Sequence, residues 1–330
     1  MRQKWIDILR GIGIFCVLLA HSSLGILDFH IASFFIPIFF FISGYLFKEN
    51  KYSNFWEILK KKSKTILLPY FLISLTLLII YVLFNKVDID FFFTQLFGIL
   101  YSRFEFIHGD SNSLNAIFNP QLWFLTALFV CEILYYLITK TKRLVFIFVI
   151  MFAVIGILLN TFLPFYLPWS IDIALICLPF FYLGKFLQSC VIEDKFKLIF
   201  LTVFLVFNLI LAYLNGVPNV SVGVLGNPIL FYIAAICGIL FYFIASPYLE
   251  KLPIISSFFI YIGLNSLTIL GFHIFAYYII RIVLNRVLPS FEQLNGQLIH
   301  GLVYSLLAVL ILWYPLRLIN KYLPSFTGKS

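Results

Sequence analysis

The sequence predicts an all-α integral membrane protein with about ten transmembrane helices and both termini in the cytoplasm. Of its 330 residues, 62% are hydrophobic and only 11% are charged, and the mean hydropathy is +1.04. A soluble domain is about half apolar and about a quarter charged. The excess apolar surface must face lipid, where helices satisfy their own backbone hydrogen bonds. Because no polar linker interrupts this pattern, residues 1–330 are expected to form a single membrane domain.

Ten apolar stretches are long enough to cross a bilayer as helices, which takes about 17 to 25 residues. The spans are expected at about residues 8–28, 33–48, 65–84, 121–139, 144–163, 169–188, 197–215, 228–246, 266–284 and 298–316. Phe55–Lys64 is expected to be a separate helix in the membrane interface, because it combines Trp56 with a lysine cluster. Residues 85–120 form the one long loop, and its segment FFFTQLFGILY is too short to span.

The basic residues test this arrangement. All but four of the 23 lysines and arginines fall in one alternating set of loops, the exceptions being Lys86, Arg103, Arg281 and Arg286. Cytoplasmic loops of membrane proteins carry such an excess of Lys and Arg. Both termini are therefore expected on the cytoplasmic side. The net charge of +9 then reflects topology and contact with membrane lipid, and no nucleic-acid partner is expected.

Cysteine and histidine spacing argues against disulfide and metal sites. The five cysteines are an odd number and include no CxxC pair, which speaks against a disulfide framework. No two histidines are three or four residues apart, so no metal site is expected on one helix face. Near the N-terminus, Asp7 and Arg10 interrupt the apolar run and no small-residue cleavage site follows. The first span is therefore expected to be retained.

The segment LRGIGIFCVLLAH carries Arg10 and His21 with only apolar or small residues between them. On a helix, eleven positions correspond to about 16 Å along the axis and leave the two side chains about 20° out of line. Asp7, three residues before Arg10, lies on the same side and can pair with it. Arg10 alone is equally explained as an anchor at the headgroups. A histidine inside a span is costly and usually faces a cavity or a proton relay.

His21 has three chemical roles open to it. A neutral imidazole can act as a general base toward a hydroxyl group, as a nucleophile that carries an acyl group, or as a proton relay in a transporter. His273, in the segment LTILGFHIF, is either a second functional histidine or a satisfied core residue. His108 lies in the long loop beside GDSNSLN, where it is a candidate contact for a substrate.

Several segments, taken in order, resemble the membrane acyltransferase-3 family, particularly its branch similar to the fucose 4-O-acetylases. They are WIDILRGIGIFCVLLAHSS, FFIPIFFFISGYLF, KKSKTILLPYF, PQLWFLTALFV, FFYLGKFL, GNPILFYIAAICGIL and YIGLNSLTILGFHI. An arginine, ten residues and then a histidine in the first span is the signature of this family. The chain departs from the fucose-acetylase branch at Phe35, where that branch often has a histidine.

The resemblance implies a membrane enzyme that transfers an acyl group, usually acetyl from cytoplasmic acetyl-CoA, to a sugar hydroxyl of a surface or lipid-linked glycan. His21 and Arg10 would be the catalytic pair. Arg10, Asp7, Lys62, Lys64 and Tyr70 would bind the acyl-CoA, and Ser43, Trp123 and His273 would contact the acceptor. No metal is implied. The location would be the inner membrane of a bacterium.

Two other classes of protein are weighed against this prediction. A transporter or flippase of lipid-linked sugars or small anions would use His21 and Arg10 as relay and substrate anchor. Transporters typically show interrupted helices in paired positions of two halves, and the sequence has no evident repeat of this kind. A non-catalytic scaffold would leave His21 without an explanation.

Overall fold

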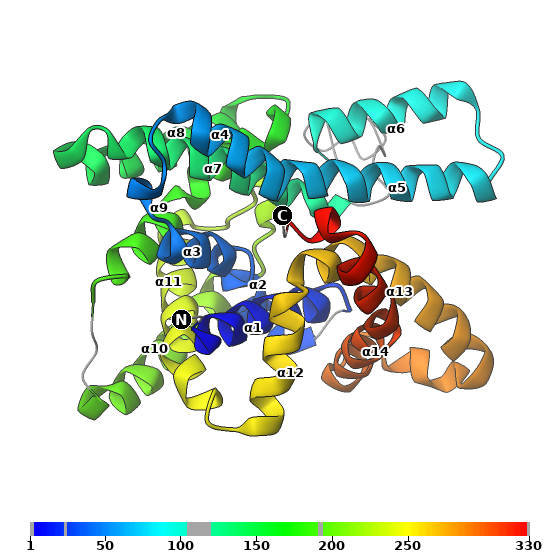
Figure 1. Cartoon of the computed structure of the whole chain (residues 1–330). Coiled ribbons are helices and arrows are strands. Elements are labelled where there is room, and N and C mark those ends of the chain that lie inside the picture. The colour runs from blue at the N-terminus through cyan, green and yellow to red at the C-terminus, as the bar shows by residue number, and fades with distance from the viewer. Residues whose placement is uncertain (1–2, 23–24, 104–119, 191–193, 329–330) are drawn as a thin grey trace. The chain divides into compact units, whose positions relative to one another are not determined.

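A computed structural model of the chain describes residues 3–22, 25–103, 120–190 and 194–328 (Figure 1). These residues are helices joined by turns and short loops, and they include an isolated β bridge between Asn219 and Val224. The predicted all-α fold is confirmed. His108 lies outside the described residues.

The chain divides into two compact units. The first unit comprises residues 1–45, 184–220 and 224–317. It contains α1 (Lys4–Ala20), α2 (Asp28–Phe34), most of α3 (Pro37–Leu46), α10 (Asp194–Asn215), α11 (Pro228–Leu249), α12 (Pro253–Leu264), α13 (Ser266–Val287) and most of α14 (Leu298–Tyr322), with 3₁₀ turns at Gly25–Leu27 and Pro289–Leu294. The 3₁₀ turn Val220–Val222 begins in this unit and ends in the second.

The second unit comprises residues 46–183, 221–223 and 318–330. It contains α4 (Phe55–Lys62), α5 (Leu68–Phe84), α6 (Ile89–Tyr101), α7 (Trp123–Thr139), α8 (Val145–Phe162) and most of α9 (Ile171–Leu187). A π-helical turn, Ser63–Leu67, joins α4 to α5. Short 3₁₀ turns lie at Glu49–Lys51, Pro120–Leu122, Lys142–Leu144, Pro168–Ser170 and Pro324–Thr327.

Eight helical stretches of the described residues are long and apolar enough to cross a membrane. They correspond to eight of the ten predicted spans. The other two predicted spans, 8–28 and 121–139, are represented by α1 and α7, which have 17 residues each. Multiple apolar helices of this kind make the protein an integral membrane protein. The sidedness of the termini stays a prediction.

The predicted limits of the first two spans are wrong in an informative way. The first helix ends at Ala20 rather than near residue 28, so His21 stands at the helix end and not in the middle of a span. The second span is interrupted between α2 and α3, where Pro37 begins the second piece. Proline has no N–H and disfavours the helical conformation of the residue before it. The break therefore follows from Pro37.

The helix expected in the interface at Phe55–Lys64 is present, but it is not separate from the next predicted span. Residues 55–84 form one continuous helical stretch of 30 residues. Asn54 caps its start by accepting a hydrogen bond from the backbone N–H of Glu57 at 3.0 Å. Pro69 has no backbone N–H to donate within a regular helix. It follows a π-helical turn in which the N–H of Leu68 donates to the carbonyl oxygen of Ser63, and the helix continues through it. The segment FFFTQLFGILY lies within α6, which packs along α5 and stacks Phe91 on Tyr81.

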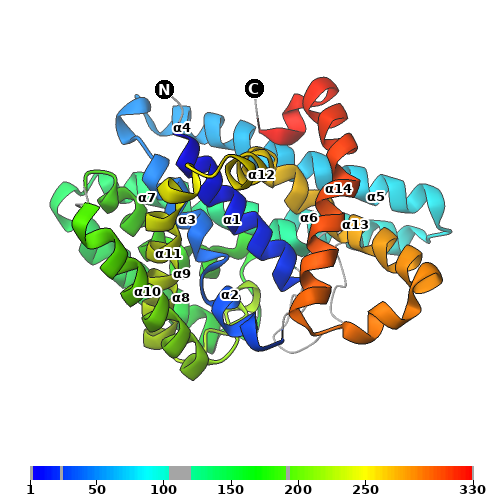
Figure 2. The same ribbon diagram turned by 90° about the horizontal axis from the view of Figure 1, so that it is seen from below.

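Helix α12 crosses α1 at close range in the first unit, as both ribbon views show (Figures 1 and 2). No predicted span corresponds to this helix. A Cβ on Gly263 would lie 2.0 Å from the carbonyl oxygen of Asp7, and a Cβ on Gly11 would lie 2.1 Å from that of Phe259. Small residues allow helices in a membrane to approach this closely. The two glycines therefore fix the position of α1, which carries both Arg10 and His21.

Candidate functional site

His21 lies at the C-terminal end of α1, with its side chain exposed. Its backbone N–H donates to the carbonyl oxygens of Val17 and Leu18, at 3.2 and 3.1 Å. The last carbonyls of a helix have no partner within it and need other donors. Here the hydroxyl of Ser22 donates to the carbonyl of Leu19 at 2.9 Å. The end of α1 is thus held in place while the imidazole of His21 stays accessible.

His273 of α13 lies directly against His21. The centroids of the two rings are 5.0 Å apart and the ring planes are inclined by 49°. In contrast to His21, the side chain of His273 is fully buried. The two residues are more than 250 positions apart in the chain. Folding therefore pairs an accessible imidazole with a buried one, a contact that the sequence analysis left open.

The two ring nitrogens of His273 differ in their surroundings. Nδ1 lies 2.9 Å from the carbonyl oxygen of Leu270 and 3.2 Å from that of Ile269. Nε2 is buried and has no hydrogen-bond partner among the described residues. Buried polar atoms without a partner are rare in native proteins and often mark a functional position. Both ring nitrogens of the buried His300 also lack a partner, but only the unpartnered nitrogen of His273 belongs to a ring that lies against the accessible His21.

Tyr277 completes this group, and the sequence analysis did not single it out. Its hydroxyl donates to the carbonyl oxygen of Leu18 at 2.6 Å and lies 3.3 Å from the hydroxyl of Ser305. Its ring packs edge-on against His273, with centroids 5.9 Å apart. The spacing of four residues from His273 places Tyr277 on the same helix face, and this spacing was the available signal.

A second aromatic group adjoins Tyr277. The ring of Tyr304 lies 5.7 Å from that of Tyr277, and its hydroxyl donates to Glu292. His300 is buried and stacks on Tyr304 with centroids 4.4 Å apart. Its Nε2 lies 3.9 Å from the Glu292 carboxylate. Tyr304 of α14 therefore packs beside Tyr277, and His300 and Glu292 contact Tyr304.

Arg10 and Asp7 lie near the other end of α1. The guanidinium of Arg10 is 3.9 Å from the carboxylate of Asp7, as the spacing of three residues predicts. Asp7 is buried and Arg10 is half-buried. Helix geometry places Arg10 about 16 Å from His21 along the axis. Ser43, another predicted site residue of this unit, is half-buried in α3.

The other predicted site residues belong to the second unit. Lys62 forms a 2.6 Å ion pair with Glu132 of α7, whereas Lys64 is exposed. The buried hydroxyl of Tyr70 donates to the carbonyl oxygen of Ile99 at 2.6 Å. Trp123 is buried at the start of α7. Of these residues, Lys64 presents an accessible charge.

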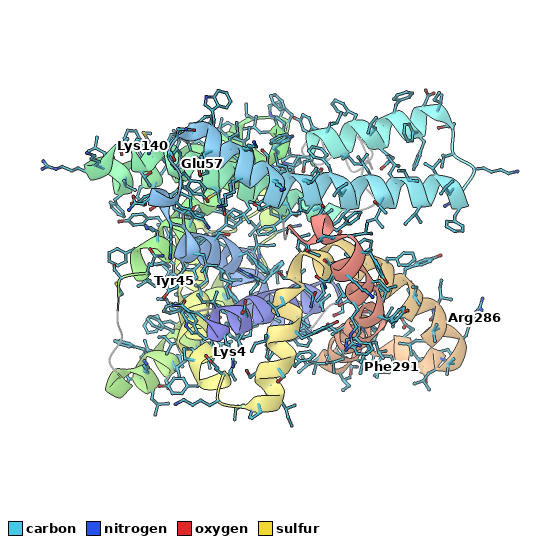
Figure 3. All side chains as sticks on the ribbon, in the orientation of Figure 1. Lys4, Tyr45, Glu57, Lys140, Arg286 and Phe291 are labelled. Carbon is cyan, nitrogen blue, oxygen red and sulfur yellow. The ribbon has the colours of Figure 1, made fainter. Side chains whose placement is uncertain are left out.

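Further basic residues lie near the ends of α7 and α4 in this unit. Figure 3 labels Lys140, which follows α7 and lies 4.3 Å over the ring of Tyr136, and Glu57 in the first turn of α4. Lys60 and Lys61 are exposed in the last turn of α4. Exposed lysines such as these suit anionic groups such as phosphates.

Neither a curated protein nor a solved structure gives a significant match to the chain. Within the described residues, no three His, Cys, Asp or Glu side chains gather closely enough to hold a metal ion. A family model, the acyltransferase domain of the acyltransferase-3 proteins, matches residues 3–317 of the 330. This match does not single out a branch. Because it spans nearly the whole chain, including Arg10, His21 and His273, the chain belongs to the acyltransferase-3 family of membrane acyltransferases.

Proposed function

We propose that the protein is an O-acyltransferase that transfers an acetyl group from acetyl-CoA to a sugar hydroxyl of a cell-surface or lipid-linked glycan. Membership of the acyltransferase-3 family supports acyl transfer in general. The observation that carries the finer proposal is the accessible imidazole of His21, which lies against the buried ring of His273. A proton acceptor at an accessible position is what the attack of a hydroxyl on a thioester requires.

In the proposed reaction His21 acts as the general base. It removes the proton from the acceptor hydroxyl while the hydroxyl oxygen forms a bond to the thioester carbonyl carbon. The carbon–sulfur bond then breaks, and the thiolate of CoA takes the proton back from the imidazolium of His21. The products are an acetyl ester and CoA. In the alternative route the His21 nitrogen first accepts the acetyl group and then passes it to the hydroxyl.

Charged residues are proposed to bind the acyl-CoA donor. Arg10, paired with Asp7 on the helix that carries His21, offers a guanidinium to the phosphates or to the thioester arm. Lys64 is exposed and is proposed to contact the donor phosphates. Lys62 and Tyr70 are proposed to act through their neighbours, because the ammonium of Lys62 already pairs with Glu132.

The acceptor is proposed to be a sugar, with Ser43 and Trp123 among its contacts, while the fully buried His273 is proposed to act on it through His21. Aromatic rings and short hydroxyl side chains are the groups with which proteins hold small polar ligands in largely apolar sites. The proposed location is the cytoplasmic membrane of a bacterium, with lipid around the helices. The bacterial membrane is inferred from the family resemblance, together with the predicted topology in which both termini and the basic loops face the cytoplasm.

The experiment that tests this function is a single-turnover reaction of the purified protein with radiolabelled acetyl-CoA and a glycan acceptor. His21→Ala is expected to lower acetyl transfer by roughly 10²- to 10⁴-fold, the usual contribution of a general base. Label that stays on the protein when no acceptor is present supports the acyl-histidine route. Unchanged transfer by His21→Ala would contradict the assignment.

A matched pair of arginine variants tests the donor site. Arg10→Ala is expected to raise the KM for acetyl-CoA, and Arg10→Lys is expected to restore part of the affinity. Arg286, labelled in Figure 3, is an exposed arginine in the last turn of α13 of the same unit. Arg286→Ala is the control and is expected to leave the KM unchanged. If the wild-type protein transports a sugar and releases no CoA, and Arg10→Ala loses this transport, a transporter is favoured.

A further inference from the structure

We infer that His273 is a positioning residue that selects the ring tautomer of His21 by accepting its N–H at Nε2. This inference rests on the proposed function, in which His21 is the base. It adds a role for the buried histidine, namely to decide which nitrogen of His21 is free to take the proton.

The surroundings of Nδ1 fix the tautomer of His273. Both atoms near it, the carbonyl oxygens of Leu270 and Ile269, can only accept hydrogen bonds. Nδ1 must therefore carry the hydrogen. A neutral imidazole has one N–H and one lone pair, so Nε2 bears the lone pair. His273 is thereby held as a hydrogen-bond acceptor on its Nε2 side.

The donor for this lone pair is His21. Nε2 of His273 has no partner among the described residues, and the ring of His21 is in contact with the ring of His273. The hydroxyl of Tyr277, the other nearby donor, is already used at 2.6 Å by the carbonyl of Leu18. Hydrogen bonds of catalytic groups are often long before substrate binds and shorten in the complex. The ring centroids, 5.0 Å apart, are close enough for an N–H of His21 to reach Nε2 once the His21 ring rotates toward it.

This arrangement gives His21 the orientation that a general base needs. With one nitrogen donating to His273, the lone pair of the other nitrogen faces the accessible side, where the acceptor hydroxyl arrives. When His21 takes the proton, the imidazolium still donates to His273, which keeps its own proton on Nδ1. Catalytic triads work in the same general way, because a third residue orients the base through a hydrogen bond.

The direct test is nitrogen NMR of the full-length protein in lipid, labelled with ¹⁵N in its histidine rings. The chain has only five histidines, so each ring can be assigned by substitution. In the wild type, His273 is expected to be protonated at Nδ1 and His21 to show a single tautomer. A wild-type spectrum with His273 protonated at Nε2 would overturn the inference, whatever any variant does.

Two substitutions of His273 separate hydrogen bonding from packing. His273→Phe keeps the ring and its volume but has no lone pair, so His21 is expected to become a mixture of tautomers. His273→Gln keeps an acceptor oxygen and is expected to retain a single tautomer. His30→Gln is the control and is expected to leave the His21 tautomer unchanged, because His30 is also a buried histidine of the first unit but pairs with Asn208 instead.

The kinetics of the same variants complete the test. His273→Phe is expected to lower kcat roughly ten- to a hundredfold, less than the loss of the base itself, while the KM for acetyl-CoA stays the same. His273→Gln is expected to recover part of the loss. An unchanged His21 tautomer in His273→Phe would refute the inference. If acetyl transfer instead survives in His21→Ala, the proposed function fails, and the tautomer measurement still reports on the ring pair by itself.

Discussion

Two buried polar groups, one in each unit, differ in how completely their atoms are satisfied. In the first unit, His273 leaves one ring nitrogen without a partner beside the accessible His21. In the second unit, the Arg103 guanidinium and the Asp172 carboxylate are both fully buried and bound to each other. Both groups contain ionisable residues, which are rare and costly inside membranes.

The group around Arg103 is complete. Its Nε donates to the carbonyl oxygen of Leu167 at 3.3 Å, its Nη1 donates to that of Ser221 at 2.6 Å, and its Nη2 donates to the carboxylate of Asp172. Asn160 donates to the same carboxylate at 3.3 Å. The charges and hydrogen-bonding groups of Arg103 and Asp172 are thus engaged with partners from several parts of the unit. A satisfied network fixes a fold, whereas an open one is available for chemistry.

The largest expected effect is on the stability of the complete network. Arg103→Met leaves the carboxylate of Asp172 buried without its cation, which is expected to lower the free energy of unfolding by about 3–5 kcal/mol. The double variant Arg103→Met/Asp172→Leu removes both charges and is expected to recover most of this loss. Denaturant unfolding in detergent measures both. A double variant as unstable as the single one would mean that the pair does not act as a unit.

A smaller loss is expected where α1 and α12 touch. Gly263→Val places side-chain atoms against the backbone of Asp7, and such overpacking costs about 1–3 kcal/mol. Because α1 must move away, acetyl transfer is expected to fall as well. Gly216→Ala is the control: it strains a residue with φ of 78°, where a Cβ meets no atom within 4 Å. It is expected to lower the thermal midpoint without lowering kcat.

Removing the hydroxyl of Tyr277 loosens the end of α1. Tyr277→Phe leaves the Leu18 carbonyl without this donor, which is expected to cost about 1–2 kcal/mol of stability and to lower kcat. Tyr242→Phe is the matched control, because the Tyr242 hydroxyl lies 3.3 Å from Nε2 of His30 in a different part of the unit. Equal loss of kcat in both variants would show that the effect is general destabilisation.

The smallest expected effect comes from exposed charge. Lys64→Gln removes an accessible cation and is expected to raise the KM for acetyl-CoA about two- to fivefold, since an exposed charge contributes about 0.2–1 kcal/mol. Lys62→Gln disrupts the ion pair with Glu132 and is expected to act on stability instead. A titration of initial rate against acetyl-CoA, beside a melting curve, distinguishes the two. A KM effect confined to Lys62→Gln would reverse the assignment.

Much of the fold could be predicted from apolar length. Stretches of apolar residues were sufficient to predict the helical spans, because lipid requires each span to satisfy its own backbone hydrogen bonds. The interruptions of these spans were harder to predict. Pro37 follows a break in its span, whereas Pro69 follows a π-helical turn and its helix continues. Helix α12 was missed because its 12 residues are too few for a membrane span. Local breaks depend on neighbouring turns, which hydropathy does not report.

The candidate site, like the fold, could be predicted only in part. The pairing of Asp7 with Arg10 follows from helix periodicity, because residues three apart share a face. Ser22 and Tyr277 were missed, although each lies close in sequence to a predicted histidine. Their importance comes from the carbonyls they satisfy at the end of α1, and the position of that end became known only from the structure.

By itself, the sequence determined the membrane class, the helical architecture and the spacing of Arg10 and His21 on one helix. These properties depend on composition and on the periodicity of a single helix, which are local. Only the tertiary structure decided that His21 stands at a helix end and that His273, from a distant helix, lies against it with a free nitrogen. Such a contact depends on how helices pack, and α1 and α13 are brought together by side chains and glycines spread over the whole unit.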